Sequence, residues 1–383
     1  MADIGLNQNI SIKNRKFHIQ TATNIDDGTI RTEIFEQGRL LYASTFKYER
    51  RSNNDEEGGE QRIRYVLDDF HQSIISNIET FFEISQILKS KDHVLSHFRL
   101  GAIFLSLHIF DKAEEHLKQA VDIDPNFHSA YIALARCYFY QKKIQDATNI
   151  LEVPVKADAN YPDLYNMLGM VLLDQKNYIH ALNHFRHAIR LNPKYKEAIF
   201  NIAAAIFKRI ALLRSQKKTD EIKRNLEFLN VILSKIYKIG DEEDQSLVKQ
   251  VKQAFSQRNF GKIQTLIFDY RNKLFYQKLA PEIVGYEFYL MLRHKPEILD
   301  KKILTLYQSK ISKILAENAD YPDMWNYRAL IHLLLCRDYF LKGLENIKQA
   351  TVINPNFKKA KSNLRLVEND GREFLSLIKA ITK

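Results

Sequence analysis

The sequence has few cysteines, and it lacks the features that mark secreted and membrane proteins. Two cysteines among 383 residues, Cys137 and Cys336, offer neither a disulfide framework nor a cluster of metal ligands, as is typical of proteins from reducing compartments. The first residues lack the apolar core of a signal peptide, and no run of about 18 uncharged apolar residues follows. We therefore expect a cytoplasmic protein without membrane insertion.

Common catalytic and nucleotide-binding motifs are absent as well. The sequence contains no GxxxxGK(S/T), GxSxG or HExxH motif and no paired CxxC. Three histidines recur at helical spacing, His180, His184 and His187, but no cysteine or acidic residue lies at a matching position beside them. This pattern favours a polar or partly buried helix face over a metal site. We expect no enzyme activity, no catalytic residue, no metal and no cofactor.

A repeat with a period of 34 residues runs through the first half of the sequence. Small residues recur at this interval, each after an aliphatic residue: Gly101, Ala135, Gly169 and Ala203. A second set follows, with small residues at Ala113, Ala147 and Ala181 and large ones at Leu117, Leu151 and Phe185. Two helices cross closely where one presents Gly or Ala, while large side chains one turn away fill the groove. Each unit is therefore predicted to be a pair of antiparallel helices, and the units must stack to bury their apolar faces.

This pattern resembles the tetratricopeptide repeat family. One unit has all seven marker positions of that family: Leu100, Gly101, Phe104, Ala113, Leu117, Ala120 and Pro125. The next unit departs at Pro154, where a small helical residue is expected, so its second helix is predicted to stop early at LEVP. A later unit starts at YPDMWNYRA (321–329), which resembles YPDLYNMLG (161–169), and it has Gly343 where alanine is usual.

Five segments follow from these patterns. They are a small antiparallel β segment (1–60), a connecting helix (61–92), a repeat block of about three repeats plus one helix (93–215), degenerate helical repeats (216–320) and a C-terminal repeat with capping helices (321–383). In the degenerate part, GDEEDQS (240–246) is predicted to separate a helix at 219–238 from helices at about 246–257 and 260–275, and a final helix is predicted at 371–382. The predicted fold is mostly α, a tetratricopeptide-type helical-hairpin solenoid preceded by a small antiparallel β-sheet.

The N-terminal segment predicts three short strands. FHIQTAT, GTIRTEIF and RLLYASTFKY are rich in β-branched and aromatic residues and are separated by DDG and EQG. A sheet this small needs a cover for its apolar face, and the helix predicted from about Gln61 to Leu88 is the candidate. The segment resembles β-rich leaders that precede such repeats in some bacterial proteins, so a bacterial source is expected.

The resemblance implies a noncatalytic scaffold or adaptor that binds one or more proteins in a concave groove. The first helix of each unit lines that groove in this family, which implies a partner-binding set of Leu95, Phe98, Leu105, Ile132, Arg136, Phe139, Asn166, Met170, Phe200 and Phe207. Large aromatic side chains in a groove are typical anchors for a partner's peptide or helix. The alternative is that the helix at 61–88 or the sheet of the same chain fills the groove. Only Arg136 and Asn166 resemble the family's carboxylate clamp, whose lysines are missing, so no co-chaperone role follows.

Positive charge is concentrated in the middle of the sequence. The formal net charge is +11, and residues 196–273 contain sixteen Lys or Arg against nine Asp or Glu. The densest part comprises Lys208, Arg209, Lys217, Lys218, Lys223 and Arg224. A basic face can bind nucleic acid by neutralising phosphates, and RNA binding by this region is therefore the alternative function. No ribonucleoprotein motif accompanies it, and solvated lysines on a helical array are the commoner explanation of such charge.

Overall fold

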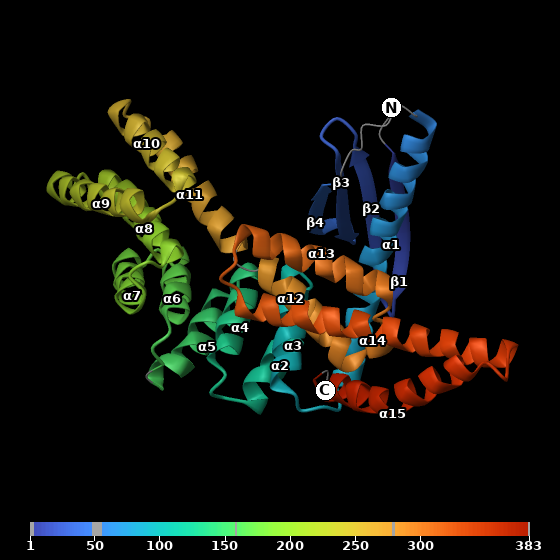
Figure 1. The fold of residues 1–383 in the computed structure, drawn as a ribbon. Helices are drawn as coiled ribbons and strands as arrows, with labels where there is room; N and C mark the ends of the chain where they lie inside the picture. Colours follow the sequence, from blue (N-terminus) through green and yellow to red (C-terminus); the bar gives the residue numbers. More distant parts are fainter. Residues whose placement is uncertain (1–3, 48–55, 158, 278–279, 382–383) are drawn as a thin grey trace. The chain divides into compact units, whose positions relative to one another are not determined.

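The computed structural model describes residues 4–47, 56–157, 159–277 and 280–381, and the chain divides into two compact units (Figure 1). The first unit combines residues 1–92 with residues 281–383, and the second consists of residues 93–280. The first unit thus joins segments from both ends of the sequence, whereas the second is continuous. The predicted division into five segments follows sequence patterns and stays a prediction.

An antiparallel sheet of four strands opens the first unit. The strands are β1 (Gly5–Ile12), β2 (Arg15–Asn24), β3 (Thr29–Glu36) and β4 (Arg39–Lys47), and they pair in sequence order. The prediction of three strands was wrong, because β1 was missed. In GLNQNISI only Ile10 is buried, and Gln8 interrupts the alternation of Leu6, Ile10 and Ile12, so the strand pattern is weaker than in β2 and β3.

Helix α1 (Glu56–Leu88) covers this sheet, as predicted, and lies along β1 and β2 (Figure 1). The ring centroids of Phe17 on β2 and Phe82 on α1 are 5.9 Å apart. A buried polar contact joins the same layers, since Thr21 Oγ1 lies 2.8 Å from His71 Nδ1. Burial of these side chains between sheet and helix stabilises a sheet that would be marginal alone.

Four more helices complete the first unit. They are α12 (Ala280–His294), α13 (Lys301–Glu317), α14 (Pro322–Ile353) and α15 (Lys358–Ile381), and a short 3-10 turn (Pro296–Ile298) links α12 to α13. The helix pair predicted from Tyr321 onward was wrong, because α14 is one helix of 32 residues. Its middle reads LLLCRDYFLKG where the earlier repeats have polar turn residues, so nothing in the sequence stops the helix there.

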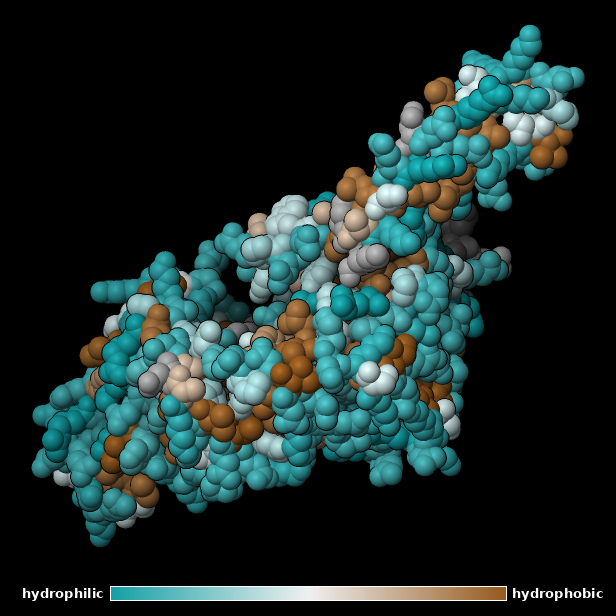
Figure 2. Space-filling view, turned by 90° about the horizontal axis from the view of Figure 1, so that it is seen from below, coloured by the Kyte–Doolittle hydropathy of each residue, from teal (hydrophilic) through white to brown (hydrophobic). Residues whose placement is uncertain are grey.

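Helix α15 also differs from the prediction, since it begins at Lys358 and continues through Gly371. Gly371 is required by packing, because a Cβ built there would clash with the Phe340 ring on α14. The buried residues of α14 all lie in its first half, and the outer end of the α14–α15 hairpin, at the right in Figures 1 and 2, exposes Val352, Ile353 and Phe357. The hairpin therefore buries its apolar residues mainly near its base, where α13 packs on α14.

Three helical hairpins open the second unit and confirm the predicted repeat. They are α2 (Val94–Ser106) with α3 (Phe110–Ile123), α4 (His128–Tyr140) with α5 (Ile144–Lys156), and α6 (Pro162–Asp174) with α7 (Tyr178–Leu191). A Cβ at Gly101 would lie 2.7 Å from Leu117 Cγ, and one at Gly169 would lie 2.5 Å from the Phe185 ring. The small residues therefore stand at close helix crossings, as the 34-residue pattern predicted.

Pro154 does not end its helix early, contrary to the prediction. Helix α5 passes through this buried proline and ends at Lys156, which makes it one residue shorter than α3 and α7. Pro154 has no N–H to donate to the preceding turn, so the helix lacks this one hydrogen bond, and it ends two residues later. A proline this close to the C-terminus is therefore compatible with the repeat.

The last four helices of the second unit pack in a ring. They are α8 (Lys196–Ser215), α9 (Thr219–Ile239), α10 (Glu242–Ser256) and α11 (Phe260–Gln277). Helix α8 packs against α9 and α11, and α10 packs against the same two helices. Helix α10 starts four residues before its predicted position, because Asp241 and Asp244 form a capping box at its N-terminus. The stack of hairpins therefore ends in a closed four-helix arrangement.

Candidate functional site

The first helices of successive hairpins, α2, α4, α6 and α8, lie side by side and form the inner face of the second unit. On α2 and α4 the predicted partner-binding residues are partly accessible. Leu95 is 41% exposed, and Phe98, Ile132, Arg136 and Phe139 are half-buried. The Phe98 ring meets Phe127 edge-on, with centroids 5.0 Å apart, so its orientation is fixed. This part of the inner face presents aromatic and aliphatic surface beside one guanidinium group.

The structure corrects the other half of the predicted groove. Five of its residues are buried within the protein: Leu105, Asn166, Met170, Phe200 and Phe207. On α8 the cover comes from α11 of the same unit, since the rings of Phe200 and Tyr270 lie 4.9 Å apart. We therefore restrict the candidate face to the accessible residues on α2 and α4.

A buried polar network runs from α6 through α8 to α11. Asn166 donates to Glu197 Oε1 at 2.8 Å, Asn201 donates to Asn166 Oδ1 at 2.8 Å, and Arg271 Nε donates to Asn201 Oδ1 at 2.6 Å. Tyr195 donates to Glu197 Oε2 at 3.3 Å, and burial, with the nearby Glu197 carboxylate, raises the pKa of this phenol. The buried asparagine amides and the Glu197 carboxylate are thus hydrogen-bonded, as buried polar groups require.

Sequence reasoning named only Asn166 among these residues. Asn201 could have been found, because it is the single polar residue in the apolar run IFNIAAAIF (199–207). A polar residue in such a run needs a buried partner. Nothing local identifies that partner as Arg271, which lies 70 positions away in the sequence.

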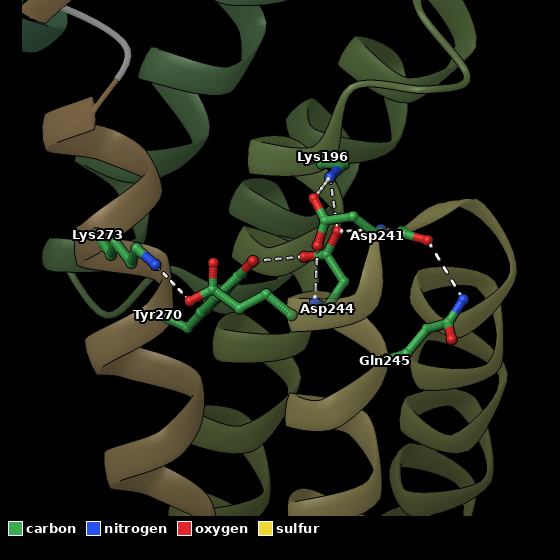
Figure 3. Close-up of polar contacts among 8 residues, drawn as sticks. Lys196, Asp241, Asp244, Gln245, Tyr270 and Lys273 are labelled. Atoms are coloured by element: carbon green, nitrogen blue, oxygen red, sulfur yellow. Dashed lines mark hydrogen bonds and ion pairs between the residues drawn. The ribbon is translucent and has the colours of Figure 1, made fainter. Parts of the chain in front are cut away.

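A second polar cluster fixes the start of α10 between α8 and α11 (Figure 3). The Asp244 side chain is fully buried and accepts hydrogen bonds from Lys196 Nζ at 2.6 Å and Tyr270 Oη at 2.7 Å. Lys196 also pairs with Asp241, and this contact lowers the pKa of the Asp241 carboxyl. Figure 3 shows Lys273 on α11 at the edge of the same cluster, where it pairs with Glu243. The cluster ties α8, α10 and α11 together and is therefore structural.

Members of the predicted basic patch make contacts with different helices. The Lys208 ammonium lies 5.2 Å from the Phe268 ring centroid on α11, whereas Arg209 pairs with Glu221 on α9 at 3.5 Å. Lys218 pairs with the same Glu221 carboxylate at 3.4 Å. The remaining predicted members, Lys217, Lys223 and Arg224, are exposed. Neighbouring charges in the sequence thus contact different helices, and one acidic residue neutralises part of the patch.

Two of the three histidines on α7, His184 and His187, pack on Tyr165 of α6. His187 and His184 lie 4.0 Å and 6.1 Å from Tyr165, measured between ring centroids, and burial lowers the pKa of both imidazoles. Among the described residues, no group of three or more His, Cys, Asp or Glu could hold a metal ion. Within the same residues, no helix is long and apolar enough to span a membrane.

Comparison with known sequences identifies the repeats. Residues 108–171 and residues 162–205 each match a tetratricopeptide repeat family. The human protein O-mannosyl-transferase TMTC3 is 32% identical over 94 residues, which cover 24% of this chain and 10% of that protein. The BBSome complex member BBS4 of Bos taurus is 28% identical over 103 residues, which cover 27% of this chain and 20% of that protein. The chain thus spans at most about a fifth of these relatives.

Matches among solved structures include MamA, with 20% sequence identity and a TM-score of 0.37. The match covers 44% of this chain and 94% of the MamA chain. A tetratricopeptide repeat protein from Parabacteroides merdae is 15% identical and covers 71% of this chain and 98% of its own, with a TM-score of 0.34. The family matches over residues 108–205 coincide with the helical hairpins that have a 34-residue period. The chain thus contains tetratricopeptide repeats within residues 108–205, and a four-stranded sheet precedes them.

Proposed function

We propose that this protein is a noncatalytic scaffold that binds a peptide or helix of a partner protein on the inner face of α2 and α4. Tetratricopeptide repeats are protein-interaction modules, and the accessible aromatic residues of this face support the proposal most directly. Phe98 and Phe139 are half-buried on successive first helices, with the Arg136 side chain one helical turn from Phe139. Partner side chains would pack on the two rings, and Arg136 would pair with a carboxylate or carbonyl of the partner.

The test is quantitative capture of cellular proteins by the tagged full chain. We expect the double variant Phe98→Ala, Phe139→Ala to lose specific partners, because removal of two aromatic anchors weakens binding by roughly 30-fold or more. A matched control, Tyr237→Ala on α9, removes an exposed aromatic side chain of the same unit and should capture as the unchanged protein does. Circular dichroism verifies that each variant keeps its helices.

Parallel captures with and without nuclease distinguish the alternative function. Proteins that persist after nuclease and depend on Phe98 and Phe139 support the proposed face. Nucleic acid, or proteins that vanish with nuclease and depend on Lys217, Lys223 and Arg224, would support RNA binding by the basic middle of the sequence. Unchanged capture by the phenylalanine double variant would refute the proposed face.

A further inference from the structure

Three lysines of the second unit lie near the proposed partner-binding face and interact electrostatically with one another. Lys142 and Lys176 occupy equivalent turns between the two helices of successive repeats, each with a backbone φ of 62°, and Lys208 lies on α8. In the part of the chain that the structure describes, none of the three forms an ion pair with a carboxylate. Other lysines of this unit, such as Lys143 and Lys196, do.

A fourth cation is held in place next to Lys208. The guanidinium carbon of Arg271 lies 6.0 Å from the Phe268 ring centroid, and the Lys208 ammonium lies 5.2 Å from the same centroid. The hydrogen bond from Arg271 Nε to Asn201 orients the guanidinium group. One aromatic ring of α11 thus brings two cations from different helices together.

These cations act on one another. Burial lowers the pKa of Lys208, and the positive charges of Arg271, Lys142 and Lys176 lower it further, against the single carboxylate of Asp174. Three positive charges therefore lie within electrostatic range of Lys208, together with one carboxylate, that of Asp174. An anionic group placed among them would be attracted by all four cations and would relieve their mutual repulsion.

The cluster continues into the proposed partner-binding face. The Lys142 ammonium lies 5.5 Å from the ring centroid of Phe139, and Arg136 precedes Phe139 by one helical turn. A half-buried aromatic ring thus has a cation on either side along α4. This arrangement is complementary to an apolar side chain flanked by carboxylates.

We propose that Lys142, Lys176, Lys208 and Arg271 bind the carboxylates of an acidic peptide segment whose apolar residue packs on Phe139. The proposal rests on the proposed function, because it names the class of partner that the same face takes. A peptide is favoured over nucleic acid because the cations are gathered at one place beside an apolar surface.

The probe is a blocked, fluorescently labelled peptide in which one phenylalanine has two glutamates on each side. A second peptide carries glutamine in place of glutamate, and a ten-residue polyuridylate serves as the nucleic-acid probe. Binding to the full chain is measured by fluorescence anisotropy at low and at physiological salt. We expect the glutamate peptide to bind about tenfold more tightly than the glutamine peptide at low salt, and this ratio to fall as salt rises.

The decisive variant is Lys142→Asn with Lys176→Asn, because asparagine tolerates the positive φ of these turns. It should reduce glutamate-peptide binding by about tenfold and leave the glutamine peptide unaffected. The matched control, Lys217→Asn with Arg258→Asn, removes the same charge from turns of the same conformation between α8 and α9 and between α10 and α11. It should bind as the unchanged protein does.

Equal binding of the two peptides, no loss in the Lys142 and Lys176 variant, or displacement of the peptide by polyuridylate would each overturn the inference. Failure of the proposed function gives a different result. In that case binding of the glutamate peptide depends on Lys142, Lys176 and Phe139, but capture of cellular proteins is unchanged by Phe98→Ala, Phe139→Ala.

Discussion

The close helix crossing in the third repeat makes a quantitative prediction for Gly169. Alanine there would place a Cβ 2.5 Å from the Phe185 ring, which is fully buried and too rigid to move aside. Replacing glycine by alanine in a helix stabilises the folded state by about 1 kcal/mol, because alanine has the higher helix propensity. Overpacking of a core destabilises the folded state by about 1–3 kcal/mol. We expect Gly169→Ala to lower the free energy of unfolding by about 1 kcal/mol, measured by urea denaturation followed by circular dichroism.

The chain supplies two controls for this experiment. At Gly343 a Cβ would meet nothing within 4 Å, so Gly343→Ala should raise the stability of its own unit by about 1 kcal/mol. The second repeat has Ala135 and Leu151 at the equivalent crossing, so adding Phe185→Leu to Gly169→Ala should recover part of the loss. A stabilising effect of Gly169→Ala alone would refute the assignment of this glycine to a close crossing.

Two further predictions concern buried carboxylates. Asp244→Ala should destabilise the second unit by about 3 kcal/mol in urea denaturation, because it removes a fully buried carboxylate that accepts hydrogen bonds from the half-buried Tyr270 and from Lys196; Asp244→Asn should lose less. In the first unit, burial raises the pKa of Glu287, which accepts a hydrogen bond from Tyr307. The folded state therefore holds this proton more tightly than the unfolded chain, and Glu287 weakens stability as pH rises above its unfolded pKa of about 4.3. Glu287→Gln should match the unchanged protein near pH 4 and exceed its stability at pH 7, and an equal pH dependence of the two would contradict this.

The repeat could be predicted from the sequence because each hairpin contacts mainly its neighbours. Gly101 and Gly169 mark helix crossings within a single unit, so a local pattern carries the information. The edge strand β1 was missed because its partner β2, rather than its own composition, makes it a strand. The first residues of α14 resemble those of α6, but the turn that should follow depends on residues near Cys336, which lie within one continuous helix.

The candidate site was predicted only in part for the same reason. Phe98, Arg136 and Phe139 follow from the register of the repeat and are half-buried, and their role in partner binding stays a prediction. The cluster around Lys208 does not follow from any local pattern, since Arg271 comes from a helix that is distant in sequence and outside the repeat. In the sequence Lys208 was grouped with Arg209, yet the two side chains contact α11 and α9 respectively.

The buried polar residues explain why α11 packs on α8 instead of leaving the inner face open. In α8, Asn201 lies within an apolar run, and an asparagine buried there without partners would cost about 1–3 kcal/mol. The Asn201 side chain forms hydrogen bonds with Arg271 and Asn166. Asp244 on α10 links the same two helices a second time, through Lys196 on α8 and Tyr270 on α11. Apolar contacts such as Phe200 with Tyr270 would tolerate several registers of α11, whereas these hydrogen bonds are satisfied in one. The same register places Arg271 beside Lys208, so the contacts that close the inner face at α8 also assemble the cation cluster at its edge.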